Sequence, residues 1–344
     1  MEYRTLGSSG TAVSNFTLGT MTFGTETDEA GSHAQLDRFL EAGGTLVDTA
    51  DVYSGNESEA IIGRWLADRP ADVTDRVVLA TKGRFPTGTG PNDVGLSRRH
   101  LSRALDASLT RLQVDTIDLY QVHAFDPFTP IEETLSFVDS AVRAGKIHYF
   151  GLSNFTGWQL QHAVDVAHYT GLTKPVTLQP QYNLLARDIE FEIVPAALAN
   201  GLGLLPWSPL GGGWLTGKYT RDERPTGSTR LGENPDRGME AYDARNTVQR
   251  TWDVVDAVRN VADSRGVTMA QVALSWLVDR PSVTSVILGA RTVEQLEDNL
   301  GAADLHLSAD ETDLLSEAST PLSGDYPYGV AGVQQRGRRI EGGR

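Results

Sequence analysis

Several side chains that could carry out acid–base chemistry follow short apolar stretches of the sequence. Asp48 comes directly after the stretch 45–47, and Tyr53 stands in the short polar loop that follows. A phenol is a weak acid near neutral pH, because its unperturbed pKa is about 10. A nearby cation would favour the phenolate and make the phenol a usable proton donor. Lys82 follows the apolar stretch 77–80 and supplies such a cation, with which Asp48 can pair.

A histidine follows another apolar stretch in the same way. His123 comes directly after residues 117–122. A single histidine is more often structural than catalytic, so its interpretation depends on the other three residues. Beside them, the imidazole would orient a carbonyl oxygen or pass on a proton. Together the four side chains indicate a proton donor that works near pH 7.

These side chains need strands that end at a common edge, and the sequence predicts such strands. Apolar runs of strand type alternate with amphipathic runs of helix type. The predicted strands are 16–19, 45–47, 77–80, 117–122, 148–152, 176–178, 202–205 and 283–288. The predicted helices are 28–42, 57–66, 97–112, 131–143, 158–168, 190–199, 247–264 and 292–300. This alternation implies parallel strands, because each crossover needs room for a helix.

About eight strand–helix units predict an α/β fold, a closed (β/α)8 TIM barrel, with a doubly wound sheet as the alternative. A Gly/Ser turn at 7–10 predicts an N-terminal β-hairpin. The Gly-, Pro- and charge-rich segment 211–245 is predicted to be a long functional loop. Residues 268–277 are predicted to form an extra helix, and 309–318 a final one. We expect a single domain over 1–318, followed by a tail over 319–344 that is disordered or a flap over the barrel mouth.

In such barrels the functional groups lie at the C-terminal ends of the strands. Nearly every predicted strand is followed by polar or aromatic side chains: Asp48, Lys82, His123, Ser153, Asn154, Gln179, Trp207, Ser208 and residues 289–291. One such residue alone carries little weight, because loop residues are usually polar. Their occurrence after so many strands predicts a site at one rim.

Motifs of other enzyme classes are incomplete, absent or explained by local structure. Residues 212–218 resemble a phosphate-binding P-loop, but Tyr219 stands where a Ser or Thr is needed. No Gly-x-Gly-x-x-Gly follows the first strand, so we expect no Rossmann-type binding of a nicotinamide cofactor. No His-Glu-x-x-His spacing and no cysteine occurs, so we expect no metal site. Glu132 and Glu133, candidate glycosidase carboxylates, open a predicted helix, where the helix dipole favours acidic residues.

The composition limits the classes of molecule that the protein is expected to bind. The formal net charge of −15 over 344 residues argues against binding to nucleic acid or anionic lipid, because both are polyanions. A phosphate-bearing ligand must therefore be held by a local basic or amide-rich pocket. The absence of cysteine excludes disulfides and thiol catalysis and fits a cytoplasmic protein. The first twenty residues contain no continuous apolar run, so we expect neither a secretory signal nor membrane insertion.

Five motifs resemble, in the same order, those of the aldo-keto reductase superfamily. They are Asp-Thr-Ala-Asp-Val-Tyr at 48–53, Ala-Thr-Lys-Gly at 80–83, Asp-Leu-Tyr-Gln-Val-His at 118–123, Gly-Leu-Ser-Asn-Phe at 151–155 and Gln-Pro-Gln-Tyr-Asn-Leu-Leu at 179–185. The resemblance runs from about residue 4 to about residue 300. It implies an NADPH-dependent reductase of small aldehydes or ketones on a (β/α)8 barrel, acting as a monomer or homo-oligomer.

The resemblance also implies a role for each residue at the rim. Tyr53 would be the proton donor, tuned by Lys82 and Asp48, and His123 would orient the carbonyl. Ser153, Asn154 and Gln179 would hydrogen-bond the nicotinamide amide, and Trp207 would stack on its ring. The rest of the cofactor cleft would consist of Gly19, Thr20, Met21, Ser208, Leu210, Gly211, Lys218, Gly289, Ala290, Arg291, Thr292, Gln295 and Asn299. Within that set, residues 208–218 would cover the pyrophosphate.

Two departures from the family pattern bear on specificity. Many members carry a lysine near position 289, where this chain has Gly289. Arg291 must therefore bear more of the recognition of the 2′-phosphate, which leaves the choice between NADPH and NADH open. Ala124 stands where bulky or basic residues are common, which would open a substrate pocket. Its candidate walls are Phe23, Phe85 and Phe125.

Two other functions share these residues. Some relatives of this fold are cofactor-binding subunits of membrane channels, so a regulatory subunit with weak turnover is an alternative. A reductase dedicated to a keto sugar is another. The sequence does not choose among carbonyl substrates, because variable loops build the pocket.

Overall fold

A computed structural model describes residues 1–329 except 228, 235 and 237. Its main sheet has eight parallel strands in the order β10-β3-β4-β5-β6-β7-β8-β9. The strands are β3 (Phe16–Gly19), β4 (Leu46–Asp48), β5 (Val78–Gly83), β6 (Ile117–Val122), β7 (Ile147–Ser153), β8 (Thr177–Gln179), β9 (Gly203–Leu204) and β10 (Val286–Gly289). Leu204 forms a parallel bridge with Val283, just before β10, and its amide donates to Ser282 at 2.7 Å. The sheet therefore closes on itself, and the predicted (β/α)8 barrel is confirmed.

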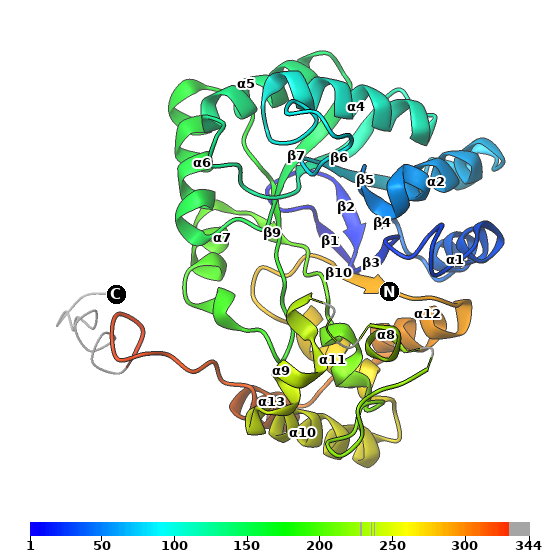
Figure 1. Ribbon diagram of the computed structural model, residues 1–344, viewed down its shortest axis with the longest axis vertical. Coiled ribbons are helices and arrows are strands. Elements are labelled where there is room, and N and C mark those ends of the chain that lie inside the picture. Colours follow the sequence, from blue (N-terminus) through cyan, green and yellow to red (C-terminus); the bar gives the residue numbers. More distant parts are fainter. Residues whose placement is uncertain (228, 235, 237, 330–344) are drawn as a thin grey trace.

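Helices surround the strands (Figure 1). They are α1 (Glu29–Glu41), α2 (Glu57–Ala67), α4 (Arg98–Leu112), α5 (Ile131–Arg143), α6 (Gly157–Thr170), α7 (Ile193–Asn200), α11 (Met269–Val278) and α12 (Val293–Leu300), with the short α3 (Ala71–Thr74) after α2. Several begin at side-chain caps: Asp28 accepts from the Gly31 amide, and Ser97 from the His100 amide. Such caps satisfy amides that have no partner within the helix. None of the described helices is long and apolar enough to cross a membrane.

The predicted hairpin covers the N-terminal end of the barrel. It consists of β1 (Tyr3–Thr5) and β2 (Ala12–Ser14), which pair antiparallel. Leu6 and Val13 of this hairpin are fully buried against barrel residues such as Leu46, Ala80 and Leu119. The N-terminal end is thus sealed, and the C-terminal rim is left for ligands.

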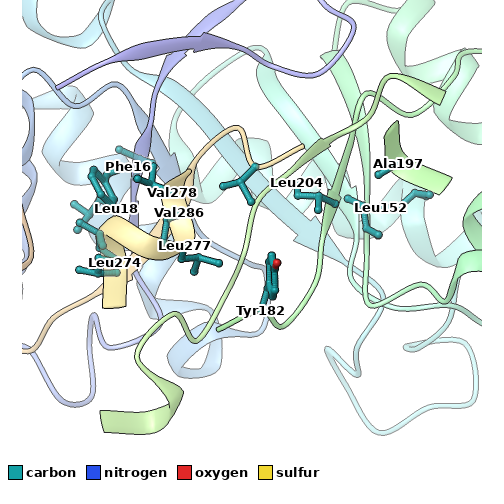
Figure 2. Packing of buried hydrophobic residues seen from close by; sticks show 14 of the residues in the cluster. Phe16, Leu18, Leu152, Tyr182, Ala197, Leu204, Leu274, Leu277, Val278 and Val286 are labelled. Atoms are coloured by element: carbon teal, nitrogen blue, oxygen red, sulfur yellow. The ribbon is translucent and has the colours of Figure 1, made fainter. Parts of the chain in front are cut away.

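The two helices before the last strand exchange the roles that the sequence suggested. We expected 247–264 to be the barrel helix and 268–277 to be extra. Instead α11 packs against β10 and α12, whereas α10 (Gln249–Arg265) packs on α11 and on α13 (Ala309–Ala318), outside the ring. Figure 2 shows Leu274, Leu277 and Val278 of α11 beside core side chains of β3 and β10. The prediction was wrong because α11 is apolar on nearly all sides, which is typical of a buried helix.

The long loop predicted at 211–245 contains short helical turns: η3 (Gly211–Thr216), α8 (Arg230–Glu233), η4 (Gly238–Glu240) and α9 (Tyr242–Asn246). Its anchor is Trp214, which is 1% exposed and stacks on Tyr242 with ring centroids 5.5 Å apart. The indole of Trp214 donates to the carbonyl of Glu240 at 3.0 Å. The loop is therefore held down by buried aromatic side chains spaced along it.

The predicted tail is described only to residue 329. Tyr328 stacks on Phe191 with ring centroids 4.8 Å apart and donates to Glu192. These two residues lie between η2 (Asp188–Glu190) and α7. Residues 330–344 of the predicted flap lie outside the described residues.

Candidate active site

Lys82 lies at the centre of the rim site. It belongs to β5, and its side chain is fully buried. Its Nζ donates to Asp48 Oδ2 at 2.6 Å, to the Thr49 carbonyl at 2.7 Å and to the Tyr53 hydroxyl at 3.2 Å. An ammonium has three N–H donors, so all three are used and the position of the charge is fixed. The structure thus brings together three of the four residues singled out from the sequence.

Tyr53 is aimed at Lys82 by an unusual turn. Directly after Tyr53, Ser54, Gly55 and Asn56 have φ values of 51°, 64° and 82°. Left-handed backbone is open to Gly and is tolerated by Asn far better than by bulky residues. The Ser-Gly-Asn sequence therefore permits a tight bend between the phenol and the start of α2.

Asp48 is held by two amide side chains besides Lys82. Its Oδ1 accepts from Gln121 Nε2 at 3.0 Å and from Gln179 Nε2 at 2.9 Å. Gln121 pairs in register with Lys82, and a side chain on Gly151, its neighbour in β7, would crowd it. We had not singled out Gln121, although it stands two residues before His123 and so faces the same side of the strand. Gln179, which we expect at the nicotinamide, also supports the Asp48 carboxylate with its amide nitrogen.

The pKa shifts of Lys82 and Tyr53 differ in part from the expectation. Burial alone would lower the pKa of Lys82, but the charge of Asp48 and the hydrogen bonds of Lys82 to Asp48 and Tyr53 outweigh it and raise that pKa. Burial raises the pKa of Tyr53, and the opposing effect of the Lys82 charge does not cancel it. We expected the cation to dominate, because the sequence shows a neighbouring charge but not the depth of burial. The phenol therefore keeps its proton and remains available as a donor.

His123 faces Tyr53 across the rim. Its ring lies edge-on to that of Tyr53 with centroids 5.9 Å apart, and Phe85 packs against its other side at 4.6 Å. Burial, together with the charges of Lys82 and Arg84, holds the pKa of His123 well below its usual range. The imidazole is therefore neutral, and its Nδ1 has no hydrogen-bond partner among the described residues. A neutral imidazole donates from one nitrogen to a neighbouring oxygen.

A second acidic cluster, which we did not predict, lies close to Lys82. Glu59 is fully buried and accepts from Thr81 Oγ1 at 2.5 Å and from Arg111 Nε at 2.7 Å. Asp51 is also fully buried, and neither carboxylate oxygen finds a hydrogen bond of good geometry among the described residues. Burial, followed by the charge of Glu59, raises the pKa of Asp51 to about 7.

This shift makes stability depend on pH. Asp51 holds its proton to about pH 7 when folded, against a normal pKa of 3.8. Between these values the unfolded chain binds fewer protons, so the free energy of unfolding falls as pH rises, by up to about 1.4 kcal/mol per pH unit. In Asp51→Asn this contribution is absent. Urea unfolding should therefore show a shallower fall from about pH 4 to about pH 7 than in the wild type, and equal slopes would contradict it.

On the other side of His123, the residues expected at the nicotinamide form a connected group. Asn154 Nδ2 donates to the His123 carbonyl at 2.9 Å and to Ser153 Oγ at 3.1 Å. Asn154 Oδ1 accepts from Trp207 Nε1 at 3.1 Å. Both Asn154 and Ser208 have a φ of 54°. The ends of β6, β7 and β9 are therefore tied together around one polar side chain beside the imidazole.

Three cations gather where the long loop meets the rim. Burial and the nearby charges of Arg291 and Arg230 lower the pKa of Lys218. Arg291 does not lie open to a phosphate: its Nε pairs with Glu26 at 2.7 Å, and its Nη2 with Glu233 at 2.9 Å. The residue expected to bind the 2′-phosphate is thus held between two carboxylates.

The remaining predicted cofactor residues lie around the β3 and β10 ends. Gly19 and Gly289 pair in register, and a side chain at Gly289 would meet no atom within 4 Å. Thr20 is buried and donates to the Asp48 carbonyl at 3.0 Å, and Met21 is 37% exposed. The others contact this region or the loop: Leu210, Gly211, Ala290, Thr292, Gln295 and Asn299. Among the described residues, no group of three His, Asp or Glu side chains could hold a metal ion.

The candidate pocket walls separate into two groups. Phe23 is fully buried in the main core. Phe125 packs edge-on against Trp158 with centroids 5.6 Å apart, and Trp158 is 62% exposed. Trp158, which we had not singled out, also lines a pocket of about 480 Å³ together with Tyr328. An aromatic wall thus runs outward from the His123 side of the rim.

Comparison with known proteins finds similarity over most of the chain. The model of the aldo/keto reductase family matches residues 15–320. An uncharacterized oxidoreductase of Bacillus subtilis, YrpG, is 37% identical over 96% of this chain and 100% of its own length. A probable voltage-gated potassium channel subunit beta of rice, Oryza sativa subsp. japonica, is 37% identical over 89% of this chain and 92% of its own. Versiconal hemiacetal acetate reductase of Aspergillus parasiticus is 33% identical over 93% and 98% of the two chains.

Proposed function

The chain belongs to the aldo/keto reductase family, and we propose that it reduces an aldehyde or ketone to an alcohol with NADPH as hydride donor and Tyr53 as proton donor. The observation that carries this proposal is the contact of the Tyr53 hydroxyl with the buried Lys82 ammonium at 3.2 Å. The neutral imidazole of His123 faces the same phenol. A protonated phenol, a fixed cation and a neutral donor on one rim match the needs of a carbonyl oxygen that gains a proton.

The proton transfer follows from these contacts. A nicotinamide cofactor, when bound, would supply the hydride that the carbonyl carbon accepts. Tyr53 gives its proton to the oxygen, and the Lys82 charge stabilises the phenolate that remains. His123 donates a hydrogen bond that positions the oxygen, while Asp48 keeps Lys82 in place. Fixed charges of this kind lower a barrier by a few kcal/mol when water is excluded.

The residues present fit a phosphate-bearing cofactor. A protein of net charge −15 needs local cations to bind phosphates, and Arg291 and Arg230 lie close enough to Lys218 to help lower its pKa. Their mutual repulsion would be relieved by a bound anion. Gly211, Gly212 and Gly213 have φ values of 56°, 66° and 99°, so this part of the loop is open to close backbone approach.

Arg291→Met should weaken binding of NADPH by roughly 10–100-fold and binding of NADH far less, because only NADPH carries the 2′-phosphate that a guanidinium binds through charged hydrogen bonds. Glu233→Gln should act in the opposite direction, because Glu233 competes for the same guanidinium at 2.9 Å. Dissociation constants for both cofactors, measured by quenching of protein fluorescence, check both variants. An equal loss for the two cofactors would contradict the assignment.

The direct test of the function is a panel of aldehydes, ketones and keto sugars, with oxidation of NADPH followed by absorbance and NADH run in parallel. Turnover of members of the panel supports the proposal and indicates whether the substrate is a keto sugar. Failure of both cofactors to be oxidised by any member would contradict it.

A second candidate is a cofactor-binding regulatory subunit with weak turnover. The observation that favours it is the similarity to proteins named as probable potassium channel beta subunits in Oryza sativa and Arabidopsis thaliana. Stable copurification with a membrane protein, together with negligible turnover on the full panel, would favour this function over the first.

We further propose that residues 1–318 form one domain, that 319–344 form a tail, and that the protein acts in the cytoplasm on a small-molecule substrate. The absence of cysteine agrees with a reducing compartment. Limited proteolysis that removes the tail and leaves the rest intact would support the domain boundary. Cell fractionation tests the location.

A further inference from the structure

Arg84 is a cation at the rim that has no carboxylate partner among the described residues. It forms no ion pair with any residue that the structure describes, although the chain has 45 acidic residues against 30 basic ones. Among the described residues, its side chain makes one hydrogen bond, from Nη2 to the Phe125 carbonyl oxygen at 3.3 Å. Its Nε is buried and has no hydrogen-bond partner among those residues. Because a guanidinium has five N–H donors, most of its binding capacity remains available.

The guanidinium lies on the His123 side of the site. Its central carbon sits over the Phe85 ring at 5.0 Å from the centroid, and that ring packs against the His123 imidazole. The charge of Arg84 also contributes to the low pKa of His123. Phe125, which accepts the one hydrogen bond, begins the aromatic wall that ends at Trp158. Arg84 therefore borders the space where a substrate would extend away from the carbonyl oxygen.

An acidic group close enough to interact with the charge of Arg84 does not pair with it. The charge of Arg84 helps to lower the pKa of Asp126, but the two side chains form no ion pair. The Asp126 carboxylate accepts instead from the Leu96 amide at 2.8 Å, the Phe128 amide at 3.0 Å and Thr129 Oγ1 at 2.7 Å. Its acceptor positions are thus taken by its own loop and by the segment that precedes α4. The cation is thus fixed beside the site and left for another anion.

We propose that Arg84 binds a carboxylate of the substrate, so that the substrate class is an aldehyde or ketone that also carries a carboxylate. This inference rests on the proposed carbonyl reduction and adds the specificity to it. The planar guanidinium matches a carboxylate through two parallel N–H bonds. The half-buried ring of Phe85 and the exposed ring of Trp158 would contact the apolar part of the molecule.

The test compares benzaldehyde with 3- and 4-carboxybenzaldehyde. In the wild type, kcat/KM should be at least about tenfold higher for one of the carboxylated aldehydes. Arg84→Gln should reduce that ratio to near one, and Arg84→Lys should retain part of it. Arg143→Gln is the matched control, because Arg143 is an arginine with a 74% exposed side chain on α5, and it should leave the ratio unchanged. A ratio near one in the wild type, or an equal ratio in Arg84→Gln, would overturn the inference while leaving carbonyl reduction intact.

Binding without turnover separates the two proposals. Benzoate and benzamide have nearly the same shape, and only benzoate is charged. Calorimetry should show about tenfold tighter binding of benzoate than benzamide to the wild type, with the difference lost in Arg84→Gln. If no aldehyde is reduced but benzoate is preferred, the proposed function fails and the Arg84 site stands. If benzamide binds as well as benzoate, the Arg84 site fails, even where a variant does not fold.

Discussion

Tyr53→Phe should lower kcat for carbonyl reduction by roughly 10²–10⁴-fold, the range expected for loss of a positioned proton donor. The variant removes a single oxygen, the one that lies 3.2 Å from Lys82 Nζ. The phenol ring is retained, so its packing against His123 is kept. Cofactor affinity should change little, because the substitution removes the proton donor and none of the cations that would bind phosphate. Stopped-flow measurement of NADPH oxidation, with a binding titration beside it, checks both statements.

Tyr120→Phe is the matched control for this loss. Tyr120 is fully buried in β6, and its hydroxyl has no hydrogen-bond partner among the described residues. Removing that oxygen should leave kcat within a factor of a few. Comparable losses of kcat in the two variants would mean that removing any buried hydroxyl slows turnover. That result would contradict the role of Tyr53 as proton donor. Unchanged turnover in Tyr53→Phe would rule out Tyr53 as the donor.

Much of the rim could be predicted because parallel strands end together. Asp48, Lys82 and His123 each stand at or directly after a strand, so eight strands in sequence were enough to bring them to one edge. Tyr53 required one more step, the search for a cation that would make a phenol useful. The family resemblance and the strand pattern agree on these residues for independent reasons.

What the sequence could not reveal depends on contacts between distant segments. Arg291 pairs with Glu26 and Glu233, which are brought together only by the path of the long loop. The spacing from His123 indicates which side of the strand Gln121 faces, but its contact with Asp48 depends on the register between neighbouring strands, which the sequence does not show. The high pKa of Tyr53 follows from burial, which neighbouring charges in the sequence do not show.

Asp48→Asn should lower the free energy of unfolding by about 3–5 kcal/mol, the usual cost of leaving one member of a buried ion pair alone. Lys82 and Asp48 are 0% and 3% exposed in their side chains and 2.6 Å apart. Neither charge can therefore turn toward water without opening the barrel. Lys82→Met should cost less, because Gln121 and Gln179 still donate to the carboxylate. Urea unfolding of the cofactor-free protein measures both.

The double variant Asp48→Asn/Lys82→Met decides whether the pair or the separate groups stabilise the barrel. With both charges removed, no uncompensated ion remains, so the loss should be smaller than the sum of the single losses. Arg143→Met provides the exposed reference: its pair with Asp139 is 2.6 Å long, but the arginine side chain is 74% exposed, so the loss should stay below about 1 kcal/mol. Strict additivity in the double variant would contradict a coupled buried pair. A recovery of stability without recovery of turnover would mean that this buried pair is retained for its charge beside Tyr53, since the fold alone does not need it.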